Sequence, residues 1–376
     1  MRRSVLVFAV VLTVALAGCA GIGVDGNDAE DIDTDLDDQT DTTDLEAEDA
    51  DQESGTEDES ASETDDSDRT DTTVDGELEI HHIDVGQADS TLVISPDGET
   101  VLVDTGDWRQ SGQGVIDYLD DHGVERIDHL VATHGHADHI GGHDEIIELY
   151  ETERDGVGAA YDSGVASTSQ TYERYLDAIE EHDVDLFEVQ EGDELPIEDD
   201  QLTGTVLNPP EGDSGSDLHY NSVAIAFEFG EFRYLTTGDA ESNAEQRMVD
   251  DWSDELDADA YHAGHHGSTT SSTEPFMDEV EPSIAIISSA YDSQYGHPHD
   301  ETLERFSEFG IETYWTGVHE DIVLTTDGQD TTVETTSDFS SDPLDLLKEK
   351  PSDDDNGGSY QITPDAFDAT PNPVAP

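Results

Sequence analysis

Apolar residues recur between residues 77 and 336 in short alternating runs and in runs with helical spacing. The segment "ELEIHHIDV" (77–85) alternates apolar and polar positions, which predicts a strand. The segment "GQGVIDYLDDHG" (112–123) has helical spacing and ends in glycine, which predicts a helix. The other expected strands are 90–95, 100–106, 126–134, 157–161, 201–207, 222–229, 232–237, 258–262, 283–288, 312–315, 321–325 and 330–335. The other expected helices are 139–150, 168–182, 241–251, 272–280 and 300–309.

The order of these elements predicts the fold class. Strands come first in a run, then alternate with helices, and then return as a run. That order is typical of an α/β protein in which mixed sheets are covered by helices on their outer faces. We therefore expect one folded domain over residues 77–338.

Two acidic segments of low complexity flank this domain. Residues 25–75 contain mainly Asp, Glu, Thr and Ser and no aromatic residue. Such a chain is solvated and self-repelling, so residues 20–76 are expected to be a disordered, extended tether. Residues 339–376 combine acidic runs with proline, which predicts a disordered tail.

The first residues have the pattern of an export signal. Arg2 and Arg3 precede an apolar run from Val5 to Ala17, which is short for a membrane span. Cys19, the single cysteine of the chain, follows small residues at the position of a lipidated cysteine. Residues 1–19 are therefore interpreted as a lipoprotein signal peptide, with an ordinary cleaved signal or a short anchor as alternatives. This interpretation places the protein on the extracellular face of the cell membrane, held by lipid at Cys19; no stable protein partner is inferred.

The charge balance is extremely acidic. The chain has 96 Asp and Glu against 12 Lys and Arg, a formal net charge of −84. Disorder is one reading of such acidity, but the strand and helix patterns argue against it for most of the chain. A halophilic protein is the better interpretation, because concentrated salt screens self-repulsion. The same screening means that the charge does not exclude a phosphodiester substrate.

The segment "THGHADHIGGH" (133–143) concentrates histidines where an expected strand ends. Residues two apart in an extended chain point the same way, so His134 and His136 can face one ion. Asp138 and His139 can face a second point nearby, and Gly141-Gly142 leaves room for close approach of the backbone. Imidazole and carboxylate ligands without thiolate suit zinc, manganese or iron. A polar loop is the alternative reading.

The same segment resembles the signature of the metallo-β-lactamase superfamily. More closely, "HIDVGQADSTLVISPDGETVLVDTG", "YLTTGDAE", "HAGHHGSTTSS" and "YGHPH" resemble the hydrolase domain of ComEC-type competence proteins. The resemblance covers about residues 77–336. It implies an αββα sandwich, in which two mixed β-sheets pack face to face with helices outside and a di-metal site at one edge.

The resemblance also implies the metal ligands. His134 and His136 would hold a first metal ion, with His219 as a third histidine, although many relatives carry Asn in that region. Asp138 and His139 would hold the second ion, and Asp239 would bridge the two. The last ligand is His265 or His266; His265 is favoured, which leaves His266 to contact substrate.

Further residues are expected near the site. The resemblance implies that Asp84 and Asp104 hydrogen-bond the ligand histidines, with ordinary turn chemistry as the alternative. Ser268 is a candidate donor to a substrate phosphate or else a turn cap. His297 is assigned to the rim of the site. His262 and His143 are expected to be structural or to support the ligands.

These assignments imply a hydrolase with two divalent metal ions, zinc being favoured over manganese. A metal-bridged hydroxide would attack the substrate, Asp138 would orient it or take its proton, and His266 would assist the leaving group. The favoured activity is that of a phosphodiesterase or nuclease acting on extracellular DNA. One alternative is a phosphoesterase for phosphocholine-like or lipid head groups. The other is a non-catalytic binding lipoprotein with the same fold.

Overall fold

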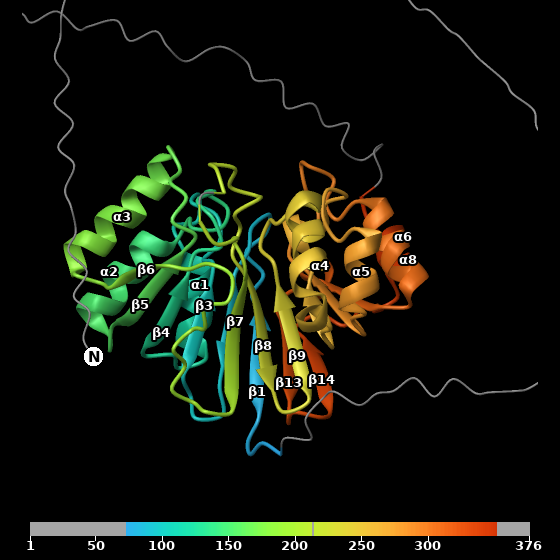
Figure 1. Cartoon of the computed structure of the whole chain (residues 1–376), viewed down its shortest axis with the longest axis horizontal. Helices are drawn as coiled ribbons and strands as arrows, with labels where there is room; N and C mark the ends of the chain where they lie inside the picture. Colours follow the sequence, from blue (N-terminus) through green and yellow to red (C-terminus); the bar gives the residue numbers. More distant parts are fainter. Residues whose placement is uncertain (1–72, 213, 352–376) are drawn as a thin grey trace, which may run out of the picture. The chain divides into compact units, whose positions relative to one another are not determined.

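The computed structural model describes residues 73–212 and 214–351, all within the compact unit Asp65–Pro376. Two β-sheets lie between two groups of helices (Figure 1). The expected signal peptide, the lipidation of Cys19 and nearly all of the expected tether concern residues outside the described ranges.

The larger sheet has the strand order β14-β13-β1-β2-β3-β4-β5-β6. Its strands are β1 (Leu78–His82), β2 (Thr91–Ile94), β3 (Thr100–Val103), β4 (Ile127–Val131), β5 (Val157–Asp162), β6 (Leu186–Glu188), β13 (Ile322–Thr326) and β14 (Thr331–Thr335). From β3 to β6 the strands are parallel, whereas from β14 to β3 they are antiparallel. The sheet is therefore mixed.

The smaller sheet has the order β12-β11-β10-β9-β8-β7. Its strands are β7 (Leu202–Asn208), β8 (Ala224–Phe229), β9 (Phe232–Thr236), β10 (Ala260–His262), β11 (Ile284–Ile287) and β12 (Glu312–Trp315). Strands β9 to β12 are parallel, whereas β8 is antiparallel to both of its neighbours, β7 and β9. This sheet is mixed as well.

The helices cover the outer faces of the two sheets (Figure 1). They are α1 (Gln113–Asp121), α2 (His143–Glu153), α3 (Gln170–His182), α4 (Ser242–Leu256), α5 (Glu274–Val280), α6 (Asp300–Phe309), α7 (Thr316–His319) and α8 (Pro343–Glu349), with a 3-10 turn, η1 (Gly264–Gly267). The first three pack on the larger sheet, and α4, α5, α6 and α8 on the smaller one.

A third apolar cluster fills the space between the sheets. Ile80 and Val131 of the larger sheet belong to it together with Phe227, Tyr234 and Ile286 of the smaller sheet, and all five are buried. Both faces of each sheet are thus covered, one by the other sheet and one by helices, which explains the many Val and Ile residues in the strands. The predicted αββα sandwich is confirmed.

The helix expected from His139 begins only at His143. The backbone of the two residues before it lies very close to another loop. A Cβ on Gly141 would lie 2.1 Å from the nitrogen of Trp108, and one on Gly142 would lie 2.4 Å from the Cα of Gly112. The two glycines permit this contact, as predicted, but they delay the helix. Three short elements, β6, η1 and α7, were not predicted.

The expectation of a disordered tail over 339–376 is wrong for its first part. Residues 343–349 form α8, whose start is capped by the side chain of Asp342 and has Pro343 in its first turn. Leu346 is fully buried in the cluster that covers the smaller sheet. Leu346 and the partly buried Leu347 pack in this cluster. Two apolar residues are too weak a signal to predict a helix from composition. Residues 352–376 lie outside the described ranges.

Within the described residues, no helix combines the length and apolarity needed to span a membrane.

Candidate metal centre

Loops from both sheets meet at one end of the sandwich and bring the predicted ligands together. The loop after β4 carries His134 to His139, the loop after β9 carries Asp239, and η1 after β10 carries His265 and His266. Parallel strands place their carboxyl ends at one edge of a sheet, so these side chains converge although they are far apart in sequence.

The first group of potential ligands consists of His134, His136, His219 and Asp239. One ligand atom of each lies within 4.8 Å of the others. The Nε2 atom of His134 is 2.8 Å from Nδ1 of His136 and 3.6 Å from Oδ2 of Asp239. Four side chains from three loops therefore point toward one position.

The second group consists of Asp138, His139 and His266. Nε2 of His266 is 3.5 Å from Oδ2 of Asp138, and Nε2 of His139 is 3.2 Å from Oδ1 of Asp239. Asp239 thus has one oxygen near His134 of the first group and the other near His139 of the second. Its position between the groups is the one required of a bridging ligand.

The structure distinguishes His265 from His266, the two neighbouring candidates for the last ligand. Both have left-handed backbone conformations, with φ of 52° for His265 and 56° for His266. The Nδ1 atom of His266 is 3.0 Å from the carbonyl oxygen of Ser288, which directs its Nε2 atom to the second group. His265 lies with His219 and Glu241, on the side of the first group, and its Nε2 atom is 3.6 Å from Oδ2 of Asp239. Such strained residues are typical of sites where function fixes the backbone.

Buried polar atoms without hydrogen bonds mark the position where a cation fits. In the described part of the chain they include Nε2 of His139, Oδ1 of Asp239 and Nε2 of His266. A buried unpaired polar atom costs about 1–3 kcal/mol, so three of them facing one another need a common partner. Imidazole nitrogens and carboxylate oxygens in this arrangement are a donor set for divalent transition metals.

The charges in the centre favour ionised carboxylates. Burial opposes the charge on Asp239, but the neighbouring His139 and His266 hold the pKa of its carboxyl well below the usual range. Burial likewise opposes protonation of His266, yet Asp239 and Asp138 raise its pKa to about 9. In contrast, burial and the charge of His139 keep the pKa of His134 well below its ordinary value. A neutral imidazole has the free lone pair that a metal ion requires.

Neighbouring loops hold the 133–141 segment by its backbone. Amide groups of Asp89, Thr105 and Trp108 donate to the carbonyl oxygens of Asp138, His139 and Ala137, at 3.1, 2.7 and 3.0 Å. Asp104 contacts a ligand directly, because its Oδ2 atom is 2.7 Å from Nδ1 of His139. These contacts from neighbouring loops fix the position of the ligand loop.

Of the other predicted site residues, Asp84 and Ser268 lie in turns and His297 lies at the rim of the centre. The carboxylate of Asp84 accepts from the amide of Gly86 at 3.0 Å, so it shapes a turn, and the expected hydrogen bond to a ligand histidine is not formed. Ser268 accepts from the amide of Thr270 at 3.3 Å in a similar turn. The ring of His297 lies 5.8 Å from that of His265, at the rim. Burial and the nearby His266 lower the pKa of His297 to about 3.

Several residues near the centre were missed by sequence reasoning. Oε1 of Glu241 lies 3.5 Å from Nδ1 of His219 and 3.3 Å from Nδ1 of His265. Asp89 is buried, and its Oδ1 atom is 3.3 Å from Nε2 of His262, which is itself buried. The available signal was their position inside the quoted segments "YLTTGDAE" and "HIDVGQADSTLVISPDGETVLVDTG", from which Asp239, Asp84 and Asp104 were predicted as site residues instead.

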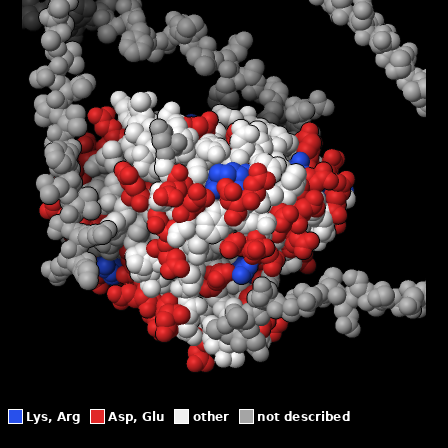
Figure 2. All heavy atoms as spheres, in the orientation of Figure 1, with Lys and Arg blue, Asp and Glu red and all other residues white. Residues whose placement is uncertain are grey.

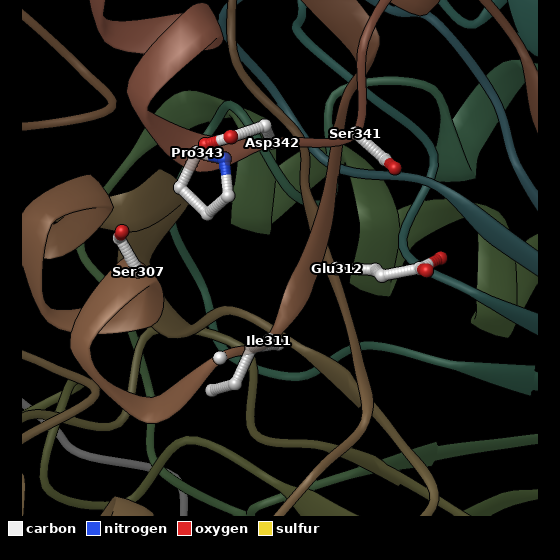
Figure 3. A pocket seen from close by; sticks show the side chains of 7 residues that line it. Ser307, Ile311, Glu312, Ser341, Asp342 and Pro343 are labelled. Carbon is white, nitrogen blue, oxygen red and sulfur yellow. The ribbon is translucent and has the colours of Figure 1, made fainter.

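One cavity in the described part of the chain lies away from the histidine groups. A cavity of about 320 Å³ is lined by Ser307, Glu312, Asp342 and neighbouring residues, between the end of α6 and the start of α8 (Figure 3). None of its lining residues belongs to the histidine groups. Acidic side chains spread over the face visible in Figure 2, with few basic ones between them.

Proteins named for competence are among the relatives that this chain resembles. The chain is 32% identical over 251 residues to ComE operon protein 3 of Bacillus subtilis, covering 62% of this chain and 31% of that protein. It is 29% identical over 229 residues to the competence protein ComA of Neisseria gonorrhoeae, covering 61% and 29%. The chain thus spans less than a third of the length of these curated relatives.

Among solved structures, the metallo-beta-lactamase fold protein YhfI of Bacillus subtilis aligns with a TM-score of 0.45 and 12% identity, over 65% of this chain and 98% of that one. The family model described as "Metallo-beta-lactamase superfamily" matches residues 83–290, more than half of the 376 residues and nearly all of the histidine loops. By this match, and with its ligand loops at one edge of an αββα sandwich, the chain belongs to the metallo-beta-lactamase superfamily.

Proposed function

We propose that this protein is a metal-dependent phosphodiesterase that cleaves DNA or related phosphodiesters. The observation that carries the proposal is the position of Asp239 between two groups of ligands, since such paired sites suit phosphoryl transfer. The relatives named as competence proteins support a nucleic-acid substrate. Members of the superfamily are generally metal-dependent hydrolases, so hydrolysis is the class of reaction expected.

Two divalent ions, with zinc favoured and manganese as the alternative, fit the donor set. His134, His136 and His219 would hold one ion, Asp138, His139 and His266 the other, and Asp239 both. Bound there, divalent cations supply Lewis-acid chemistry, lowering the pKa of water and stabilising charge on phosphate oxygens.

The protein's own side chains then have distinct tasks. Asp138 is partly exposed, with 32% of its side chain accessible, so it can both hold a metal and orient the attacking water or take its proton. His265 is not in the second group, and 21% of its side chain is accessible. We therefore assign to His265 the assistance to the leaving group that the sequence had suggested for His266.

We further propose that the domain works outside the cell, anchored by lipid at Cys19, in a high-salt environment. Support comes from the sequence of residues 1–19 and the net charge of −84. A membrane-bound enzyme of this kind would meet extracellular DNA. Phosphocholine-like or lipid head groups are the second candidate substrates, since an anchored enzyme also meets these.

A non-catalytic binding protein on the same fold is the alternative of a different class. Against it stands the full set of seven potential ligands, because a binding module has no need to keep them all. The test is a metal analysis of the purified protein in molar salt, followed by hydrolysis of bis-p-nitrophenyl phosphate. We expect about two equivalents of metal, and loss of hydrolysis with retained fold in Asp239→Asn. Less than one equivalent of metal, or full activity in that variant, contradicts the enzyme assignment.

A further inference from the structure

Trp108 is an exposed aromatic residue attached to the ligand loop. Its amide donates at 3.0 Å to the carbonyl oxygen of Ala137, the residue between His136 and Asp138. The backbone of Gly141 lies close to the same amide nitrogen. Despite this fixed backbone, 49% of Trp108 is accessible to solvent. A large indole is usually buried, so its exposure beside a reaction centre indicates a surface for a ligand.

Tyr295 is a second exposed aromatic residue near the centre, on a different loop. Its ring centroid is 5.7 Å from that of His297, which lies 5.8 Å from His265 and 6.1 Å from His266. Of its surface, 58% is accessible, the largest fraction among the exposed large apolar and aromatic side chains of the described residues. One exposed aromatic residue is thus bonded through its backbone to the ligand loop, and a second contacts His297 at the rim of the centre.

The guanidinium group of Arg109 lies over the ring of Trp108. The guanidinium carbon of Arg109 is 5.6 Å from the ring centroid of Trp108, and its NH1 atom is 3.1 Å from Oδ2 of Asp107. Only 12 Lys and Arg stand against 96 Asp and Glu in the chain, so an exposed Arg beside the centre is unusual. Aromatic rings with an adjacent Arg are the combination that binds single-stranded nucleic acid, through base stacking and the phosphate backbone.

We propose that Trp108 and Tyr295 stack unpaired nucleobases next to the scissile phosphate and so select single-stranded nucleic acid. This inference rests on the proposed phosphodiesterase function. Stacking needs a base whose face is free, which a duplex does not offer. A choline group would instead need a ring without a competing cation, and Arg109 already lies over Trp108, so a second cation would be repelled there.

The test compares two substrates with the same phosphodiester backbone. One is a single-stranded DNA oligonucleotide, and the other is an abasic chain of equal length. Base stacking contributes about 1–3 kcal/mol, so Trp108→Ala and Tyr295→Ala should each raise KM for the DNA about 10-fold. Cleavage of the abasic chain should not change. Trp108→Phe should restore the KM, because Phe keeps a stacking face.

Phe187→Ala serves as the matched control, because Phe187 is similarly exposed, at 50%, and lies on the outermost strand β6. It should leave both KM values unchanged. The inference is overturned if the variants affect both substrates equally, if duplex DNA is cleaved as well as single strands, or if Trp108→Ala impairs only a phosphocholine ester. If the wild-type protein cleaves neither DNA nor the abasic chain, the proposed function itself fails.

Discussion

The carboxylate of Asp104 accepts a hydrogen bond of 2.7 Å from Nδ1 of His139, and thereby turns Nε2 of that histidine toward Asp239. Asp104 is held in turn by the amide and hydroxyl of Thr133, at 2.9 and 2.7 Å. An anionic acceptor of this kind fixes the tautomer and the orientation of a metal-binding imidazole. The affinity of the centre thus depends on a residue that is not itself a ligand.

Asp104→Asn should therefore weaken metal binding about 10–100-fold while the fold persists. Asn keeps the size of the side chain and tolerates the φ of 58° at this position, but it lacks the negative charge. Competition with a chelating dye in molar salt measures the affinity, and circular dichroism checks the fold. Asp183→Asn is the matched control, since Asp183 has a φ of 55° and is exposed on α3's C-terminal cap. Equal affinity in the two variants would show that Asp104 does not orient a ligand.

Replacing His266 should reduce the metal content, whereas replacing His265 should reduce the turnover. His266→Ala should lose about one metal equivalent, because His266 lies with Asp138 and His139. His265→Ala should keep both equivalents and lose turnover by about 100-fold, as expected when a proton donor is removed. Elemental analysis and steady-state kinetics on the two variants decide between them. Metal loss in His265→Ala with full metal in His266→Ala would reverse the assignment.

Asp162 should make the stability depend on pH. Burial, with a contribution from Glu188, raises the pKa of its carboxyl to about 6, while its Oδ1 atom accepts from the amide of Gly164 at 2.8 Å. A pKa raised in the folded state favours the protonated form. Its contribution to stability is therefore complete below pH ~4, the unfolded value, and is lost as the pH rises through about 6.

Asp162→Asn keeps a neutral group at that position and should stabilise the protein by about 2–3 kcal/mol near pH 7.5. The gain should be about 1 kcal/mol smaller at pH 5. Denaturant unfolding of both proteins from pH 5 to 8 in molar salt measures the difference. Asp183→Asn, which removes a charge from an exposed position, separates this effect from the loss of one negative charge. A gain that grows toward acid pH has the wrong sign and refutes the argument.

Helix α8 should contribute to stability although it lies in the segment expected to be disordered. Leu346→Ala should reduce the free energy of unfolding by about 2–4 kcal/mol, because Leu346 is fully buried. Leu344→Ala in the same helix should change it by less than about 1 kcal/mol, because Leu344 is 40% exposed. Denaturant unfolding of both variants makes the comparison, and equal effects would mean that α8 is not docked.

Two of the elements that sequence interpretation missed, β6 and α8, were missed for physical reasons. β6 has three residues, all partly or fully exposed, so it lacks the apolar alternation that marks a strand. α8 is stabilised by packing against the smaller sheet rather than by its own pattern, and short helices depend on such contacts. In both cases the stabilising partner is distant in the sequence.

The sequence by itself predicted the strands and helices and an α/β class with mixed sheets covered by helices, and its resemblance to a known superfamily added the αββα sandwich. Alternation in the strands and spacing in the helices are local properties, and the segment from His134 to His139 delivers its side chains from a single loop. Only the tertiary structure decided which of His265 and His266 faces the second group, and that Glu241 lies against His219 and His265. Both side chains approach Asp239, but His265 lies 3.6 Å from its Oδ2 atom and His266 lies 3.8 Å from its Oδ1 atom. The choice here depends on backbone angles and on the carbonyl oxygen of Ser288, which a separate strand brings to the site.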